Sequence, residues 1–359
     1  MNKNQYRKLG DYIAPAMEKN VGLKIHLSQG ICNNKYFQTP RQVAQDSEND
    51  QIVRRGQFAF NKATTRNGEK ISIAYRDGED CTVSSAYQVF YIKDEEQLNP
   101  YYLMMWFKRP EFDRYARFKS HGSAHEFFTY EEMCNVLLPV PSIEEQRRIV
   151  SEYQTVEQRI QNNEQLIKKL EETAQAIYNH TFVEGIDEEN LPKGWKVTTM
   201  AQICDFAYGK MPKEEDVVDN GIPVYCGYAV TKYYKYASHT KKTIVVIARG
   251  DAGSGEVKMS PNEFFLSNLG IAIMPKDENL KWYLYYHLLT KDTYSLRTGS
   301  AQAQVTINSI EPFEVIIPPQ DKIMYFSNIV ESLSKYKDNL LSENSHLNSL
   351  LSLLTSKLS

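Results

Sequence analysis

A long heptad pattern near the middle of the chain most constrains what this sequence can fold into. Between Ser142 and Glu184 the chain has neither proline nor glycine, and apolar side chains recur at alternating steps of four and three. This spacing keeps one stripe of a helix against a partner over many turns. The predicted stripe consists of Ile149, Tyr153, Val156, Ile160, Asn163, Ile167 and Leu170, followed by Ala174, Ile177 and Thr181.

A second stretch near the C-terminus follows the same rule and supplies a partner. At ~1.5 Å per residue the first helix would span roughly 58 Å, so its stripe needs a second helix to cover it. Asn163 and Asn344 put a polar residue in each stripe. Such residues either fix the register at a cost in stability or lie partly in solvent, and the sequence leaves both open. The second stripe consists of Phe326, Val330, Leu333, Lys337, Leu340, Asn344, Leu347, Leu351, Leu354 and Leu358.

The residues outside these helices form two similar blocks. Three short segments recur in the same order, and a repeat near half the chain length predicts a pseudo-twofold molecule rather than a solenoid. Strand-like runs at 56–60, 71–75 and 83–92, with a helix after Asn99-Pro100, indicate a mixed α/β domain. The recurring segments are Leu98–Leu103 with Leu280–Tyr285, Gly122–Ala124 with Gly299–Ala301, and Val136–Pro139 with Val315–Pro318.

The chain offers no catalytic, cofactor-binding or metal-binding pattern. Asn99-Pro100-Tyr101-Tyr102 is similar to the N-P-P-Y motif of amino-methyltransferases, but the second proline is missing, so we expect a helix cap. Arg249–Gly255 lacks the G-K-[ST] ending of a phosphate-binding loop and predicts a tight turn, with or without a phosphate contact. The seven histidines form no helical metal pair. The five cysteines are scattered and predict reduced thiols.

Local charge is more informative than the net charge of −3, which by itself argues against nucleic-acid binding. Polyanion binding needs cations on one face, not a positive average. Three clusters are rich in Lys and Arg, at residues 54–76, at 231–249 and at 108–119, while the acids cluster elsewhere along the chain. Scattered surface charge remains the alternative. The third cluster comprises Lys108, Arg109, Arg114, Arg117 and Lys119. The candidate DNA contacts are Arg54, Arg55, Lys62, Arg66, Lys70, Arg76, Lys232, Tyr233, Tyr234, Lys235, Lys241, Lys242 and Arg249.

The order of these motifs resembles the specificity (S) subunits of type I restriction–modification systems. In that family a G-S-A segment, an aliphatic strand, prolines and an E-Q pair lead into each long helix. The second copy here has Lys322-Ile323 in place of Glu-Gln, and Leu191–Trp195 is similar to the usual start of the second domain. The matching residues are Gly122-Ser123-Ala124, Leu137–Pro141 and Glu145-Gln146, and then Gly299-Ser300-Ala301-Gln302 and Ile316–Pro319.

The resemblance implies an α+β (mixed α/β) fold with two target-recognition domains joined by two long antiparallel helices, a coiled coil. The implied boundaries are 1–141 and 184–319 for the domains, and 142–183 and 320–359 for the helices. It also implies a cytoplasmic, non-catalytic subunit that reads a bipartite double-stranded DNA target. Two methyltransferase (M) subunits and restriction (R) subunits would be its partners and would carry S-adenosylmethionine, ATP and Mg²⁺, with no membrane involved.

Two other classes of function remain open at this point. One is a free-standing DNA methyltransferase or nuclease, and the other is a coiled-coil scaffold that does not bind DNA. Salt-dependent binding to DNA would separate the scaffold from both DNA-binding classes, because counterion release makes affinity fall steeply with salt.

Overall fold

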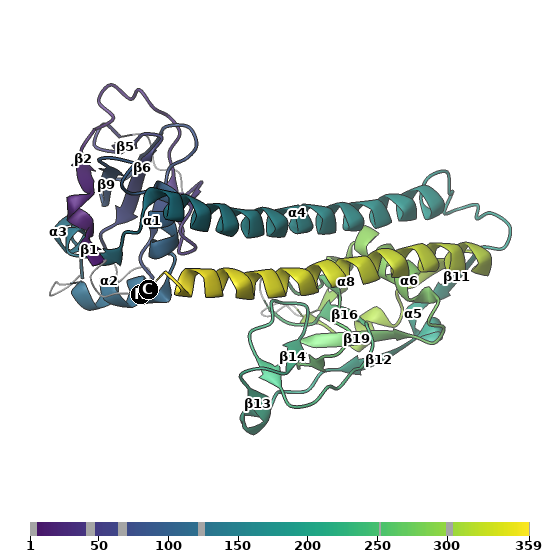
Figure 1. Ribbon diagram of the computed structural model, residues 1–359. Coiled ribbons are helices and arrows are strands. Elements are labelled where there is room, and N and C mark those ends of the chain that lie inside the picture. The colour runs from purple at the N-terminus through teal and green to yellow at the C-terminus, as the bar shows by residue number, and fades with distance from the viewer. Residues whose placement is uncertain are drawn as a thin grey trace. The chain divides into compact units, whose positions relative to one another are not determined.

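The computed structural model describes residues 6–40, 47–63, 70–120, 126–250, 253–298 and 304–358 (Figure 1). The chain divides into two compact units: unit 1 is Met1–Asn163 with Ser342–Ser359, and unit 2 is Glu164–Leu341. Two long helices, α4 (Ile143–Phe182) and α8 (Gln320–Ser356), run unbroken through the boundary between the units. Each unit therefore contains one α/β domain and part of both helices, as the predicted fold class requires.

The domain of unit 1 is built on an antiparallel sheet with strand order β2-β9-β6-β7. Its strands are β2 (Ile13–Ala16), β6 (Gln57–Asn61), β7 (Ile73–Tyr75) and β9 (Tyr87–Ile92). In the core, Phe58 stacks on Phe90, and Phe107, the last residue of helix α1 (Pro100–Phe107), meets both rings edge-on. The remaining elements are β1 (Tyr6–Lys8) paired with β10 (Leu137–Pro139), β3 (Gly30–Ile31) with β4 (Phe37–Gln38), β5 (Gln51–Val53) with β8 (Cys81–Val83), the 3-10 turn η2 (Leu9–Asp11), and helices α1 (Pro100–Phe107), α2 (Pro110–Lys119) and α3 (Tyr130–Cys134).

The domain of unit 2 repeats this frame with the order β12-β19-β16-β17. These strands are β12 (Cys204–Tyr208), β16 (Ile244–Ile247), β17 (Val257–Met259) and β19 (Gly270–Pro275). Around them lie β11 (Lys196–Thr199) paired with β22 (Glu314–Ile317), β20 (Arg297–Thr298) with β21 (Gln304–Val305), helices α5 (Met200–Ile203), α6 (Leu280–Thr290) and α7 (Ile307–Ile310), and the 3-10 turns η4 (Glu214–Asp216) and η5 (Thr293–Leu296). A second sheet, β13-β15-β14-β18, consists of β13 (Val217–Val218), β14 (Ile222–Tyr225), β15 (Tyr233–Tyr234) and β18 (Phe265–Leu266).

A buried tyrosine marks the same position in both units. The Tyr102 hydroxyl donates to the Pro139 carbonyl at 3.1 Å, and the Tyr283 hydroxyl donates to the Ile316 carbonyl. These bonds confirm the predicted repeat and correct two of its alignments. Tyr102 corresponds to Tyr283 and not to Leu284, so the first pair of segments is shifted by one residue. Pro139 corresponds to Ile316 and not to Pro318, because the strand pairing sets the register and the apolar letters at this site do not.

A lysine also occupies equivalent positions in the two units. Lys93 Nζ donates to the carbonyls of Gly10 and Asp11, both at 3.1 Å. Lys276 Nζ donates to the carbonyls of Ala201 and Gln202, both at 3.2 Å. In each unit this bond joins the turn before the first sheet strand to the end of the strand that pairs with it.

The two long helices pack antiparallel in each unit, and the predicted stripes are confirmed. In unit 1, Tyr153 packs near Leu354 and Leu358, while Arg159 pairs with Glu343 at 2.8 Å. In unit 2, Ala174 and Tyr178 of α4 pack with Phe326 and Val330 of α8. Near the ends of α4, Val150 and Phe182 are buried whereas Ile149 and Thr181 of the stripe are only partly buried, because Val150 packs in the core of unit 1 and Phe182 in that of unit 2.

The polar residues in the stripes are buried and meet each other inside unit 1. Asn163 and Asn344 are 2% and 8% exposed. Asn163 Nδ2 donates to Asn344 Oδ1 at 2.8 Å. Partial exposure to solvent is therefore excluded for both residues. That this bond fixes the register of the helices stays a prediction.

Local capping follows the sequence in one place and departs from it in another. The Asn99 side chain caps α1 by accepting from the N–H groups of Tyr101 and Tyr102 at 2.9 and 3.1 Å, which confirms the helix-cap prediction. At the start of α4, Ser142 Oγ accepts from the Glu145 N–H at 3.4 Å. The spacing of Ser142 and Glu145 is typical of a capping box, but the Glu145 carboxylate pairs with Arg148 at 2.7 Å, so only the serine half of that box is described.

Candidate nucleic-acid interface

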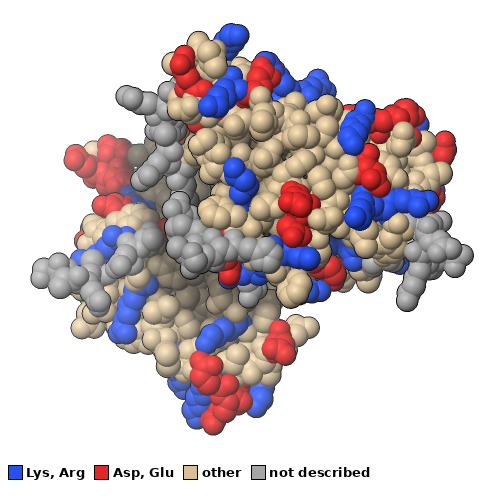
Figure 2. Space-filling view, turned by 90° about the vertical axis from the view of Figure 1, so that its left-hand side faces the viewer, with Lys and Arg blue, Asp and Glu red and all other residues tan. Residues whose placement is uncertain are grey.

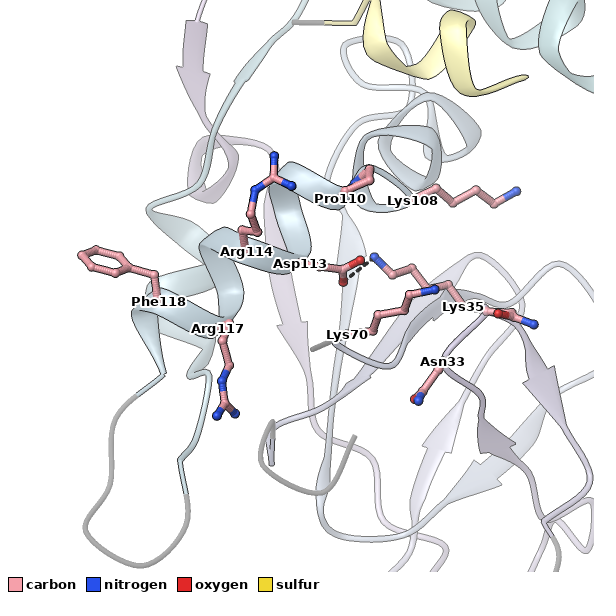
Figure 3. A pocket seen from close by; sticks show the side chains of 10 residues that line it. Asn33, Lys35, Lys70, Lys108, Pro110, Asp113, Arg114, Arg117 and Phe118 are labelled. Atoms are coloured by element: carbon pink, nitrogen blue, oxygen red, sulfur yellow. Dashed lines mark ion pairs between the residues drawn. The ribbon is translucent and has the colours of Figure 1, made fainter. Parts of the chain in front are cut away.

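A cationic cleft of 980 Å³ opens in unit 1 between α2, the turn after β3 and the segment that begins at residue 70 (Figure 3). Its lining includes five cations and one acid. Arg114 and Arg117 project from α2, and Lys35 and Lys70 lie across from that helix. Such a cluster on one face is the electrostatic footprint of a polyanion site. The lining residues are Asn33, Asn34, Lys35, Lys70, Lys108, Pro110, Asp113, Arg114, Arg117 and Phe118.

Lys35 lies deepest in this cleft, and its sequence position gave no sign of the role. Its Nζ lies 2.7 Å from Asp113 Oδ1 and also donates to the Phe107 carbonyl. The same carboxylate oxygen accepts from the Ile71 N–H at 3.1 Å. Burial lowers the pKa of Lys35, and the neighbouring Asp113 opposes that shift. The one acid in the lining is thus paired with Lys35, and Lys108 pairs with Glu157 at 2.6 Å.

The other cations of the lining come from two of the predicted clusters, which folding brings together. Lys70 belongs to the first cluster, whereas Lys108, Arg114 and Arg117 belong to the third. Arg114 pairs with Glu111 at 3.1 Å and Arg117 with Glu126 at 2.9 Å. These guanidinium groups keep exposures of 70% and 46%, so they remain accessible to a ligand.

The rest of the first cluster lies away from the cleft lining. Arg54 is paired with Glu18 and with Asp80, and this guanidinium holds the pKa of both carboxyl groups below the usual value. Arg76 donates to the Glu79 carbonyl and stacks over Phe37 with 5.3 Å from its guanidinium carbon to the ring centre. Arg55 is exposed and Lys62 is half-buried. Arg66 and the Gly122–Ala124 and Gly299–Gln302 segments lie outside the described residues.

In unit 2 the predicted cations face acids that are distant in sequence. Lys232 pairs with Glu214 at 2.8 Å, and Lys235 lies 3.5 Å from Asp216. Tyr234 is 1% exposed and its hydroxyl donates to Asp216 at 3.2 Å. The sequence prediction that acids sit apart from these cations is therefore wrong in space, because β13 pairs with β15 and brings the acidic η4 turn beside them.

The remaining unit 2 candidates have different surroundings. Lys242 is 12% exposed and bridges Asp338 and Ser334 of α8 at 2.7 and 2.6 Å, so it ties its domain to the long helix. Lys241 is exposed, and its Nζ lies 3.7 Å from Glu278 Oε1. Tyr233 is partly exposed. Their DNA contacts stay predictions, as does that of exposed Arg249, but Tyr234 and Lys242 lack the exposure that direct contact requires.

The glycine-rich turn after Arg249 has a packing reason. A Cβ on Gly250 would lie 2.3 Å from the Tyr228 hydroxyl, and one on Gly253 would lie 2.8 Å from that ring. Gly250 also has a φ of +123°, which an L side chain rarely adopts. Both glycines thus leave room for Tyr228, while residues 251 and 252 between them lie outside the described part of the chain.

Charge on the visible surface is mixed rather than segregated. On the face shown in Figure 2, Lys and Arg lie interspersed with Asp and Glu over the described residues. Among those residues no three His, Cys, Asp or Glu side chains gather as a metal site. The described part of the chain also has no helix long and apolar enough to cross a membrane.

Two copies of one domain, each followed by a long helix that packs against the other, define a class of two-domain recognition proteins with a helical spacer. The model of the type I restriction modification DNA specificity domain matches residues 4–172 and again 192–352. The chain belongs to that family, which confirms the resemblance noted from its motifs. The two matched regions agree with the two repeats of the structure.

Two relatives show the extent of the likeness. The specificity subunit of the type I restriction enzyme MjaIX from Methanocaldococcus jannaschii is 25% identical over 268 residues, 65% of this chain. That match spans 62% of the relative's length. The crystal structure of a type I restriction–modification S subunit from M. genitalium has a TM-score of 0.64 at 17% identity, with 100% and 97% of the two chains covered. This second likeness shows a shared fold.

Proposed function

We propose that this chain is a DNA sequence-specificity subunit that recognises a bipartite target, with one half-site contacted by each unit. The observation that carries this proposal is the repeat of a domain with its share of both helices, matched twice by the family model. A protein with two recognition domains reads two separated half-sites, since each domain presents its own surface. The cationic cleft of unit 1 supports a phosphate-binding role for that unit.

The partners and cofactors form a further part of the proposal. Methylation and cleavage belong to two methyltransferase subunits and to restriction subunits, which this chain directs to its target. S-adenosylmethionine, ATP and Mg²⁺ are held by those subunits. The similar subunit from M. jannaschii is named as the specificity subunit of a restriction enzyme, and that description supports a division of labour among chains.

The long helices act in this proposal as the spacer that sets the distance between half-sites. Half-sites read from one face of DNA lie about one helical turn apart, ~34–36 Å. One extra heptad lengthens a helix by ~10 Å, which corresponds to about three base pairs of DNA. We expect a heptad inserted after Asn163 in α4 and its match before Asn344 in α8 to widen the spacer without changing either half-site.

Sequencing of modified bases in cells that express the variant with its partner subunits measures that outcome. The matched control carries the heptad in α4 alone, which shifts the pairing of the two helices by one heptad on one side of the insertion. This control should lose modification at both spacings. An unchanged spacer in the doubly extended variant rules out the helical ruler.

Binding of the purified chain to duplex DNA tests the recognition itself. The logarithm of affinity should fall linearly with that of salt, with a slope of about −0.9 per phosphate contacted. Substituting Lys70, Arg114 and Arg117 together by alanine should reduce the slope by about 2–3. A chain with no affinity for DNA at low salt would instead be a scaffold.

A further inference from the structure

The turn between β3 and β4 places two asparagines at the rim of the cationic cleft. Asn33 and Asn34 are exposed, line the cleft and lie on the same side of it as Lys35 and Lys70. No charged or polar motif in the sequence distinguishes this Asn-Asn-Lys turn. An inference drawn from it rests on the proposed function, since it concerns how unit 1 reads its half-site.

The turn is held by contacts at both ends, although its tip faces solvent. Lys35 has a φ of +65°, and its N–H donates to the Cys32 carbonyl at 2.9 Å to close the turn. Its side chain then reaches back to Asp113 of α2 at 2.7 Å. At the base of the hairpin the Ile31 N–H donates to the Tyr87 hydroxyl at 3.3 Å, and Phe37 packs under Arg76.

The two asparagines differ in how their side chains are held. Asn33 Oδ1 accepts from the Ser72 hydroxyl at 3.2 Å, which ties the turn to the residue before β7. Asn34 is the next residue along, on the exposed tip, where its side chain is hydrogen-bonded to the hydroxyl of exposed Tyr36. A fixed turn that presents an amide beside cations has the two kinds of group that DNA reading needs, because cations position a protein on phosphates and amides discriminate base edges.

We propose that the Asn33-Asn34 turn reads an A·T base pair of the half-site contacted by unit 1, with Asn34 as the specificity-determining residue. An asparagine amide offers one donor and one acceptor, which match N7 and the N6 amino group of adenine in the major groove. Lys70, Arg114 and Arg117 bind flanking phosphates. Asp113 does not repel them, because Lys35 neutralises it.

The test measures specificity separately from affinity. The full chain selects its target from a randomised duplex library, and binding is then compared on that target, on single base-pair variants and on unrelated DNA. Asn34→Ala should weaken binding to the target by roughly 5- to 150-fold and relax the preference at one A·T position. Its affinity for unrelated DNA should change by less than about twofold.

Matched variants separate base reading from phosphate binding. Lys70→Ala should weaken binding to all duplexes by a similar factor and leave the selected sequence unchanged. Asn49→Ala removes the same exposed amide outside the cleft lining and should change nothing. Equal unfolding midpoints for these variants and the wild type show that the fold is intact.

The outcomes also distinguish this inference from the function on which it rests. If the wild type selects a sequence and Asn34→Ala selects the same one with unchanged discrimination, the turn does not read a base. The same conclusion follows if Asn34→Ala weakens all duplexes equally, or if the relaxed position is a G·C pair. If the wild type selects no sequence at all, the proposed function fails together with the inference.

Discussion

The two domains share one order of strands and helices but differ in the side chains that join each domain to the long helix that follows it. At the start of α4, Gln146 is fully buried, accepts from the Asn99 N–H at 2.8 Å and donates to the carbonyls of Gln97 and Pro141. Ile323 occupies the equivalent place in α8 and is equally buried. There Gln320 at the start of the helix instead donates to Asp277 at 3.1 Å.

This difference shows which parts of the frame depend on particular side chains. The tyrosine and lysine bonds present in both units end on backbone carbonyls, which exist whatever the sequence. The Glu-Gln pair of the first copy, by contrast, serves a polar junction that the second copy fills with an apolar side chain. The departure at Lys322-Ile323 is therefore a repacked junction, and the helix begins in the same place.

Exchanging the two junction residues should have the largest effect on stability. Gln146→Ile leaves the Asn99 N–H and two carbonyls without partners, at about 1–3 kcal/mol for each buried group, so unit 1 should lose about 3 kcal/mol or more. Ile323→Gln should destabilise unit 2 by about 1–3 kcal/mol, because it buries an amide among apolar groups. Urea unfolding followed by fluorescence distinguishes them in variants that keep Trp106 alone for unit 1 or Trp282 alone for unit 2. If neither substitution changed the free energy of unfolding, Gln146 and Ile323 would not be equivalent junction residues.

Acid should weaken unit 2 more than unit 1. His287 in α6 stands where α1 has Trp106, and its Nδ1 lies 3.0 Å from the Tyr178 hydroxyl. Burial lowers the pKa of His287 from 6.5 to about 4, with Lys291 adding to the shift and Glu188 opposing it. The unfolded chain binds a proton below pH 6.5 that the folded unit refuses until about pH 4, so stability falls as pH falls through that window.

The expected loss across this window is about 3 kcal/mol, because one unit of pKa corresponds to 1.36 kcal/mol. Urea titrations of the wild type and of His287→Gln at pH 7 and pH 4.5 measure it. The variant should lose less stability than the wild type between these values, whereas the Trp106 signal of unit 1 should respond equally in both proteins. A pH dependence that is identical in the two proteins would assign the acid response to other groups.

The buried amide pair gives unit 1 a register element that the described stripe of unit 2 does not repeat. Asn163→Leu should lower the free energy of unfolding of unit 1 by about 1–3 kcal/mol, because it leaves the Asn344 amide buried without its partner. The double variant Asn163→Leu/Asn344→Leu should recover most of that loss and relax the helix register. Denaturation measures the first effect, and disulfide trapping across the helices measures the second. A double variant no more stable than the single one would show that the pair has no coupling.

The smallest effects concern single surface lysines. Lys70 lines the cationic cleft, so Lys70→Ala should reduce the salt slope of DNA binding by about 0.9. Lys232→Ala in unit 2 should leave the slope nearly unchanged, since this lysine is not among the residues that line the cationic cleft. Its stability should change by less than about 1 kcal/mol, as expected of an exposed ion pair. Equal slopes for the two variants would place phosphate contacts in both units.

The sequence predicted those features that depend on periodicity or on neighbouring residues. The stripes through Tyr153 and Leu340, the Asn99 cap and the doubled domain all follow from local spacing, and the structure confirms them. Lys35 was missed because its partner Asp113 lies far along the chain, and a turn lysine has no distinguishing pattern. The pairing of Lys232 with Glu214 was missed for the same reason, since only strand pairing brings the two together.

The division of the chain also sets an order in which its parts can form during synthesis. Unit 1 is interrupted by the whole of unit 2, and its core includes Leu351, Leu354 and Leu358 near the far end of the chain. At ~5–20 residues per second, a ribosome takes roughly 10–35 s to make the intervening residues 164–341. During that interval Val150 and Tyr153 lack their α8 partners, so unit 2 can close first and the domain begun earliest is completed last.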